Sequence, residues 1–244
     1  MHLLVTRPEP DAIKLRALLE EHGHEATVEP LQSVEFEDAE PIELDGVQAL
    51  IATSRNALAA LAEDPSLPLA RDLPLFAVGR ATAARARAMG FATVITGAGT
   101  AAELAQHIVS VVEPSAGFLL HLAGEQLAGD IKADLEAHGF RVLQPVVYRM
   151  VAATRLGAVT LDRLSDGDID GVILMSPASA RIYAGLIAKH GLAPLVRRLT
   201  HFCLSPAVAQ RLQPLGAVPV EVAAAPRLEE ILALIDAVAA QSER

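Results

Sequence analysis

The sequence repeats itself in outline, and this repeat limits the folds that the chain can adopt. Residues 11–23, DAIKLRALLEEHG, resemble residues 127–139, LAGDIKADLEAHG (127 − 11 = 116). Residues 77–94 resemble residues 203–220 in the same way (203 − 77 = 126). Two similar units in one chain predict a bilobed protein. We therefore expect a cleft between the lobes, which is a common place for a ligand.

The pattern of apolar residues predicts an α/β fold. Short apolar runs are followed by helical patterns throughout, which is typical of parallel sheets with crossover helices. The chain has no Trp and only 3% aromatic residues, so we expect aliphatic cores. Helices are expected at 11–22, 54–63, 80–89, 101–112, 127–138, 177–189, 206–213 and 227–240. Two five-stranded parallel sheets are expected, from strands near 2–6, 25–29, 48–53, 74–78 and 92–95, and near 117–122, 140–144, 170–175, 199–204 and 218–222.

Two extended segments do not fit this scheme of strands and helices. One begins QSVEFED at Gln32 and is acidic, and the other begins VVYRM at Val146. Both start as alternating or β-branched stretches. We interpret them as a pair of linkers between the lobes, not as core elements.

The charge and the apolar content exclude several classes of protein. The net charge of −10 argues against a general nucleic-acid binder, although local N–H groups and a few arginines can still bind a small anion. No apolar run approaches the roughly 18 residues of a membrane span. We expect no signal peptide in MHLLVTRP, and the single cysteine, Cys203, predicts a cytosolic protein without disulfides.

Polar residues follow the predicted strands. In open parallel sheets, ligands bind at the carboxyl ends of the strands, where helix N-termini offer free N–H groups to carboxylates or phosphates. Any single Ser or Thr there is more often an N-cap, by about two to one. Six such turns in repeated positions nevertheless predict an anion-lined cleft. They are 6–8, 53–56, 79–82, 123–125, 176–179 and 205–206.

Only two tyrosines occur, and they differ in context. Tyr148 lies in the second linker, VVYRM, where its phenol could donate a proton to a leaving oxygen. Packing of this aromatic against a lobe is the simpler interpretation from composition alone. Tyr183 lies in the helical pattern ARIYAGLI and fits ordinary core packing.

Several motifs that would indicate a cofactor or a metal are incomplete in this sequence. DGDIDG at 166–171 begins like an EF-hand, but position 12 is Pro177 instead of Glu. GAGTAA at 97–102 lacks the third glycine of a dinucleotide fingerprint. His22 and His24 flank a helix-ending glycine, where a pair is usually on the surface. We therefore predict no metal and no cofactor, and a buried, unreactive Cys203.

Six motifs distributed along the chain resemble the uroporphyrinogen-III synthase family, and the resemblance covers essentially its whole length. No single motif is specific, but their order and spacing together are. The motifs are VTRP at 5–8, ATSRNAL at 52–58, AVGRATA at 77–83, LAGEQLAGDIKADLEAHGFRV at 122–142, VVYRM at 146–150 and LMSPASA at 174–180.

The resemblance implies how the repeated parts are combined. The family has two lobes joined by a two-stranded antiparallel ladder. Lobe one would contain residues 1–34 with 152–244, and lobe two would contain 38–146. The linkers would be 35–37 and 147–151. Each lobe would then have a five-stranded sheet, and nothing in the sequence demands more than a monomer.

The resemblance also implies a reaction. The family substrate is hydroxymethylbilane, a linear tetrapyrrole with eight carboxylates, delivered by the upstream hydroxymethylbilane synthase. The enzyme expels the terminal hydroxyl as water, inverts ring D through a spiro intermediate and closes the macrocycle without a cofactor or metal. Because the pyrroles supply the electrons, the protein mainly positions the linear tetrapyrrole and prevents direct head-to-tail closure of the ring.

Individual roles follow by motif. Tyr148 matches the family tyrosine that assists departure of the hydroxyl, and Thr82 matches the threonine of the VG-x-x-TA turn. The second-lobe counterpart, often IGP-x-TA in the family, is Leu204-Ser205-Pro206 here, so Ser205 takes the place of a missing glycine and threonine. The residues expected to bind substrate are Thr6, Arg7, Ser54, Gly79, Thr82, Gly124, Ser176, Ser179 and Ser205.

Two other functions compete with the synthase. A non-catalytic bilobed protein that binds an anionic small molecule would share the lobes, although secreted examples carry a signal peptide. A two-lobed glycosyltransferase would need a longer chain and a nucleotide site. Thermal stabilisation by tetrapyrroles, but not by sugars, amino acids or nucleotide sugars, would distinguish the three.

Overall fold

The computed structural model describes residues 1–37 and 41–242. Strands and helices alternate along this part of the chain, which confirms a mixed α/β fold with parallel sheets flanked by helices. The predicted first residue of lobe two, Asp38, lies outside the described residues.

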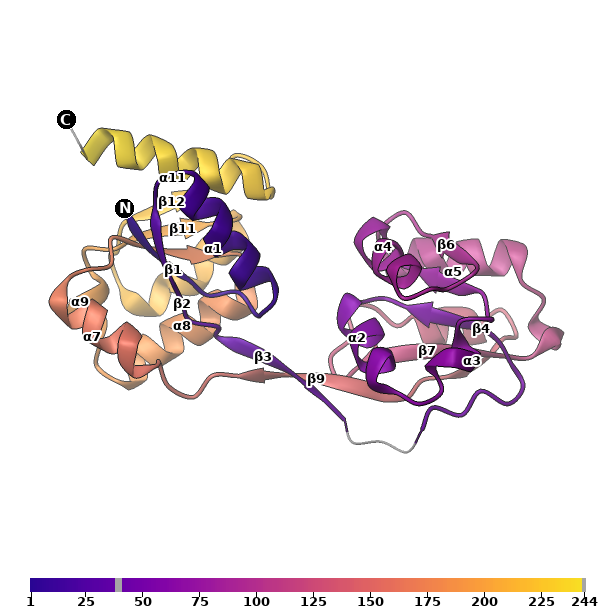
Figure 1. The fold of residues 1–244 in the computed structure, drawn as a ribbon. Coiled ribbons are helices and arrows are strands. Elements are labelled where there is room, and N and C mark those ends of the chain that lie inside the picture. Colours follow the sequence, from indigo (N-terminus) through magenta and orange to yellow (C-terminus); the bar gives the residue numbers. More distant parts are fainter. Residues whose placement is uncertain (38–40, 243–244) are drawn as a thin grey trace. The chain divides into compact units, whose positions relative to one another are not determined.

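The chain forms two compact units (Figure 1). Unit 1 contains Met1–Ser33 and Val151–Arg244, and unit 2 contains Val34–Met150. The chain therefore changes unit twice, and each change falls inside a strand. These strands are β3 (Gln32–Phe36) and β9 (Val146–Ala152).

The sheet of unit 1 has five strands within the described residues, in the order β12-β11-β10-β1-β2. Every neighbouring pair is parallel, with Leu4 paired to Val172 across β1 and β10. The strands are β1 (His2–Val5), β2 (Glu25–Val28), β10 (Gly171–Leu174), β11 (Thr200–Cys203) and β12 (Val220–Val222).

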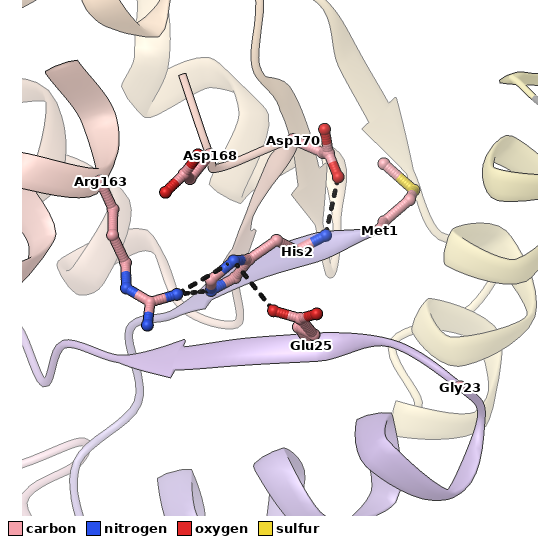
Figure 2. Close-up of a pocket in the computed structure, with 7 residues that line it drawn as sticks. All are labelled: Met1, His2, Gly23, Glu25, Arg163, Asp168 and Asp170. Carbon is pink, nitrogen blue, oxygen red and sulfur yellow. Dashed lines mark hydrogen bonds and ion pairs between the residues drawn. The ribbon is translucent and has the colours of Figure 1, made fainter. Parts of the chain in front are cut away.

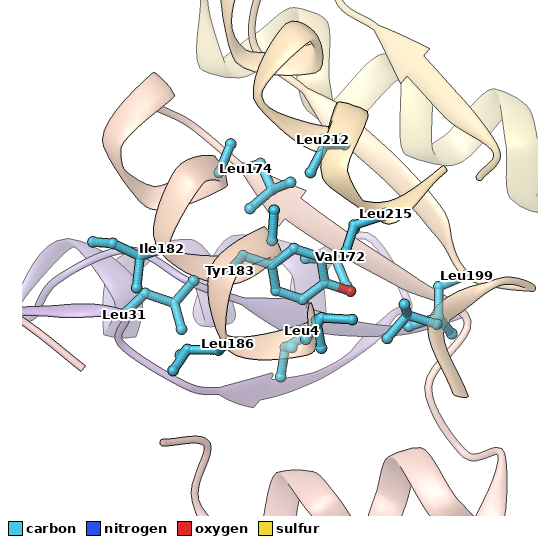
Figure 3. Packing of buried hydrophobic residues seen from close by; sticks show 14 of the residues in the cluster. Leu4, Leu31, Val172, Leu174, Ile182, Tyr183, Leu186, Leu199, Leu212 and Leu215 are labelled. Carbon is cyan, nitrogen blue, oxygen red and sulfur yellow. The ribbon is translucent and has the colours of Figure 1, made fainter. Parts of the chain in front are cut away.

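Both faces of this sheet are covered by helices, because β1 and β10 are apolar on both sides. Leu3 and Val5 pack with helices α1 (Asp11–Glu21) and α11 (Leu228–Ser242). Leu4 points to the other face, into the core around Tyr183 (Figure 3). That core is covered by α7 (Ala158–Asp166), α8 (Pro177–Lys189), α9 (Ala193–Val196), α10 (Pro206–Ala209) and the 3₁₀ helix η2 (Gln210–Leu215).

The sheet of unit 2 has seven strands within the described residues, so the prediction of five is wrong for this unit. The order is β3-β9-β7-β4-β5-β6, and β8 also pairs with β7. The two segments predicted to be linkers, β3 and β9, are the added strands. The others are β4 (Val47–Ala52), β5 (Leu75–Ala77), β6 (Val94–Thr96), β7 (Phe118–Gly124) and β8 (Arg141–Leu143).

The addition of β9 has a simple geometric cause. β8 pairs with the first half of β7, from Phe118 to Leu120, and β9 pairs with its end at Ala123 and Gly124. One edge of β7 is thus covered by two successive segments of the chain. Pro145, which has no N–H, separates them and accepts a hydrogen bond from the Ala123 N–H (3.0 Å).

Helices also cover both faces of the unit 2 sheet. Leu50 and Leu120 pack with α2 (Arg55–Glu63), α3 (Leu67–Ala70) and α4 (Arg80–Ala88). Ile51 and Leu119 pack on the other face with α5 (Ala101–Val111) and α6 (Ile131–Glu136). A single 3₁₀ turn, η1 (Pro114–Ala116), precedes β7 among the described elements.

The two copies of the first repeat fold alike. The first repeat contains α1 and β2 in unit 1 and α6 and β8 in unit 2. Five glycines that follow helical segments have positive φ, a conformation that glycine adopts without strain. They are Gly23, Gly90, Gly139, Gly191 and Gly216.

His22 and His24 hold the C-terminal helix to the rest of unit 1. His22 is exposed as predicted, but the surface prediction is wrong for His24. The Asp236 carboxylate of α11 lies 2.8 Å from His22 Nδ1 and 2.9 Å from His24 Nε2, and His24 is buried. Burial alone would raise the pKa of Asp236, but the hydrogen bonds from His24 and His22 hold that pKa below its usual value.

A candidate anion site at the carboxyl edge of the unit 2 sheet

Five of the ten predicted site residues come from four neighbouring strands of unit 2. Ser54 follows β4, Gly79 and Thr82 follow β5, Gly124 ends β7 and Tyr148 lies in β9. The order β9-β7-β4-β5 and the parallel pairing put these strand ends on one edge. Neighbouring strands lie about 4.8 Å apart, so the edge from β9 to β5 is about 14 Å long.

The N-terminus of α4 differs chemically from that of α2. At α2, the Ser54 hydroxyl accepts a hydrogen bond from the Asn56 N–H (3.1 Å), which caps the helix. At α4 the N-cap is Gly79, which has no side chain to bond the N–H groups of the first turn. Those N–H groups are left for solvent or for a ligand.

Thr82 lies in this first turn and has an unused hydroxyl. The residue is only 5% exposed, and its hydroxyl makes no hydrogen bond to any residue that the structure describes. Its oxygen is not among the buried polar atoms that lack a partner, so solvent reaches it and it is open to a ligand. Together with free N–H groups and the positive end of the helix dipole, it forms a site suited to a carboxylate.

Tyr148 reaches the same edge through an irregularity in the sheet. Ala123 pairs with Val146, but the next residue, Gly124, pairs with Tyr148, so β9 has a bulge at Val147. The Glu125 N–H donates to the Tyr148 carbonyl (3.0 Å). The half-buried ring packs against the apolar core, and its hydroxyl has no hydrogen-bond partner within residues 1–37 and 41–242.

His121 is a buried group near this edge that sequence reasoning missed. It lies in β7, 1% exposed, with Nε2 3.1 Å from Thr53 Oγ1 and Nδ1 3.1 Å from Gln144 Oε1. Burial lowers the pKa of His121, so the ring is neutral. It links the turn after β4 to the segment before β9. A histidine inside the apolar run FLLHLAG was the available signal.

The predicted residues of unit 1 lie at the corresponding edge of its sheet. Several of their hydroxyls already form hydrogen bonds within the protein. Ser176 Oγ accepts from the Ser179 N–H (3.1 Å) and lies 2.9 Å from Ser179 Oγ, which caps α8. The buried Thr6 hydroxyl donates to the Ile173 carbonyl (2.7 Å). Ser205 precedes the four-residue helix α10 and makes no capping bond.

Arg7 is the cation of the unit 1 edge. Its Nη2 lies 2.7 Å from the carboxylate of Asp11, the first residue of α1, and its side chain is 27% exposed. This pairing orients the guanidinium and leaves some of its five donors for a second carboxylate.

Comparison with known families identifies the family of the chain. The family model for uroporphyrinogen-III synthase HemD matches residues 13–233. The chain belongs to the uroporphyrinogen-III synthase family. Members of this family are lyases of porphyrin biosynthesis that act on a linear tetrapyrrole.

Solved structures of uroporphyrinogen-III synthases share the fold. The enzyme from Helicobacter pylori is 21% identical to this chain and has a TM-score of 0.64. The match covers 100% of each chain. A mutant enzyme from Thermus thermophilus is 17% identical, with a TM-score of 0.51 over 100% of this chain and 99% of the other. No curated protein sequence matches the chain significantly.

A polar pocket in this uroporphyrinogen-III synthase family member lies away from the predicted residues (Figure 2). It has a volume of about 580 Å³ at the amino ends of β1, β2 and β10. Burial and the nearby Arg163 lower the pKa of His2. The His2 N–H donates to Asp170 (2.7 Å), so DGDIDG stabilises the strand start.

Cys203 is buried as predicted, and burial raises the pKa of its thiol to about 12. In the described part of the chain, no three His, Cys, Asp or Glu side chains are grouped as metal ligands. No helix among the same residues is long and apolar enough to cross a membrane.

Proposed function

We propose that this chain catalyses the reaction of its family, the cyclisation of hydroxymethylbilane to uroporphyrinogen III with inversion of ring D and loss of water. In this proposal the carboxyl edge of the unit 2 sheet binds part of the substrate. The family match over residues 13–233 supports the enzyme, and no observation favours a non-catalytic binding protein.

The N-terminus of α4 is the observation on which the proposed binding mode depends. It combines uncapped N–H groups with the unpartnered Thr82 hydroxyl, which solvent reaches, and Arg80 is exposed in the same turn. A carboxylate of the substrate would accept hydrogen bonds from these donors. The local positive character offsets the unfavourable net charge of the chain, because it acts at contact distance.

Tyr148 is proposed as the acid that assists departure of the terminal hydroxyl. Its phenol would donate a proton as the C–O bond breaks, and water leaves. The pyrrole nitrogen supplies the electron pair, and the proton that is lost when the ring closes restores the phenol. The role is supported by the free hydroxyl of Tyr148 and by its place on the same edge as Thr82.

The unit 1 edge is proposed to bind further carboxylates of the substrate. Arg7 and Ser205 have donors that form no hydrogen bond among the described residues. Ser176 caps α8 by accepting from the Ser179 N–H, so these two serines would contribute through the helix end. We leave the Thr6 hydroxyl out of the proposed contacts because it donates to a main-chain carbonyl.

Other properties remain part of the proposal. They are the two lobes joined by an antiparallel pairing of β3 with β9, a monomeric state, a cytoplasmic location and supply of substrate by the upstream hydroxymethylbilane synthase. The hydrogen-bonded neighbourhood of β3 and β9 and the Arg149–Glu35 ion pair (2.9 Å) support the strand pairing.

A coupled assay tests the proposal. Hydroxymethylbilane would be generated by its synthase in the presence of this protein, and the oxidised porphyrin isomers separated. A dominant type III isomer is expected. Folded protein that yields only type I, the spontaneous isomer, would refute the activity.

The binding mode is tested in the same assay by Thr82→Val. Loss of a hydrogen bond to a charged group should raise KM about tenfold or more, and Thr82→Ser should restore most of the affinity. Thr93→Val is the matched control, because Thr93 is exposed just before β6, at the opposite edge of the sheet. An unchanged KM for Thr82→Val would contradict the proposed site.

A further inference from the structure

The Tyr148 ring fills the space at the end of β7 that a side chain on residue 124 would need. A Cβ atom added to Gly124 would lie 2.5 Å from Tyr148 Cζ, 2.7 Å from Oη and 3.0 Å from Cε1. Distances this short do not occur between real Cβ atoms and their neighbours. The phenol therefore lies directly on the glycine backbone, in a position open only because residue 124 has no side chain.

The need for glycine here is not a matter of backbone conformation. Gly124 is absent from the glycines with positive φ, and it forms part of an ordinary strand. A residue with a side chain could adopt this backbone. The constraint is instead steric, and its partner is the end of one side chain and not the main chain.

The bulge in β9 supplies the other half of the arrangement. Because Val147 is an extra residue, Tyr148 and not Val147 stands opposite Gly124. The hydrogen bond from Glu125 N–H to the Tyr148 carbonyl fixes that register. In a regular strand the one-residue shift would turn the phenol to the other face.

We propose that Gly124 is a positioning residue for Tyr148, and that it acts by leaving room for the phenol against the strand and not by contacting the substrate. This inference rests on the proposed function only for its kinetic consequence. In Gly124→Ala the ring is displaced while the fold is kept, since the far end of a side chain can move.

The first test is spectroscopic and needs no substrate. The chain has two tyrosines and no Trp, so the Tyr183→Phe background leaves Tyr148 as the only tyrosine. In that background, 3-fluorotyrosine labelling gives a single ¹⁹F resonance. Gly124→Ala should shift it, and Gly185→Ala should not, because Gly185 is exposed on α8 with open space around its Cα. An unshifted resonance in Gly124→Ala would overturn the proposal.

The second test separates positioning from substrate contact. Gly124→Ala should lower kcat by about 100-fold, as expected for a displaced catalytic group, but should cause little further loss in Tyr148→Phe. An equal loss in both backgrounds would show that Gly124 acts directly on the substrate, which contradicts the inference. If the native protein gives only type I isomer, the proposed function fails, while the ¹⁹F shift still decides the position of the ring.

Discussion

Tyr183 Oη lies 3.2 Å from His201 Nε2, and both side chains are buried in unit 1. The other ring nitrogen, Nδ1, faces the Pro219 carbonyl at 3.1 Å, which can only accept a hydrogen bond. Nδ1 therefore carries the proton, and Nε2 accepts from the phenol. This pair is a neutral, satisfied network within the core, and it explains why Tyr183 is not available for chemistry.

The neutral state of His201 predicts acid sensitivity. Burial lowers its pKa from the usual 6.5, so the unfolded chain binds a proton at a higher pH than the folded chain does. The free energy of unfolding should therefore fall as pH drops below about 6.5, by up to about 1.4 kcal/mol per pH unit for each such group. Urea unfolding at pH 7.5 and 5.5 measures this.

His201→Gln should reduce that pH dependence, whereas His138→Gln should not, because His138 is exposed on its helix end. The ring resonances of His201 provide a direct check. A titration of His201 with an ordinary midpoint near 6.5 would contradict the prediction.

Removal of the Tyr148 hydroxyl should affect activity, and removal of the Tyr183 hydroxyl should affect stability. Tyr148→Phe should slow turnover by about 100-fold or more, since it removes the proposed acid, with an unchanged free energy of unfolding. Tyr183→Phe should lower that free energy by about 1 kcal/mol, since it removes the donor to His201, with unchanged kcat/KM. Each variant loses one hydroxyl, so each is the control for the other. Equal turnover in the two variants would contradict the role of Tyr148.

His121 should be important for the stability of unit 2. His121→Leu leaves the Thr53 hydroxyl and the Gln144 amide without their buried partner, which should cost about 1–3 kcal/mol. Hydrogen exchange of peptides from β4 and β7 measures the loss within unit 2. His107→Leu is a suitable control, because His107 contacts Phe76 only edge-on at 6.3 Å. Unchanged protection in His121→Leu would mean that water replaces the ring.

Arg7 should contribute binding and not chemistry. Arg7→Ala should raise KM more than it lowers kcat if the guanidinium only holds a carboxylate. Arg16→Ala is the matched control, since Arg16 also forms an i,i+4 ion pair on α1, with Glu20 (3.6 Å). Equal losses in kcat and kcat/KM for Arg7→Ala would show that Arg7 acts in the transition state instead.

Local patterns in the sequence were enough to predict most of the strands. Apolar runs are local signals, so each of the ten predicted strands overlaps an observed strand. Short helices such as α3 and α9 were missed, because four residues are too few to show a helical period.

Strand pairing and hydrogen-bond partners, in contrast, depend on contacts between distant segments of the chain. β9 looked like a linker because nothing in VVYRM encodes that the edge of β7 is open beyond β8. The fit of Tyr148 on Gly124 likewise depends on a bulge between segments far apart in the chain. The same holds for two hydroxyls that follow strands. Packing lets the Thr6 hydroxyl bond a main-chain carbonyl and leaves the Thr82 hydroxyl without a partner among the described residues. Pairing and hydrogen-bond satisfaction are non-local, and therefore only the folded chain determines them.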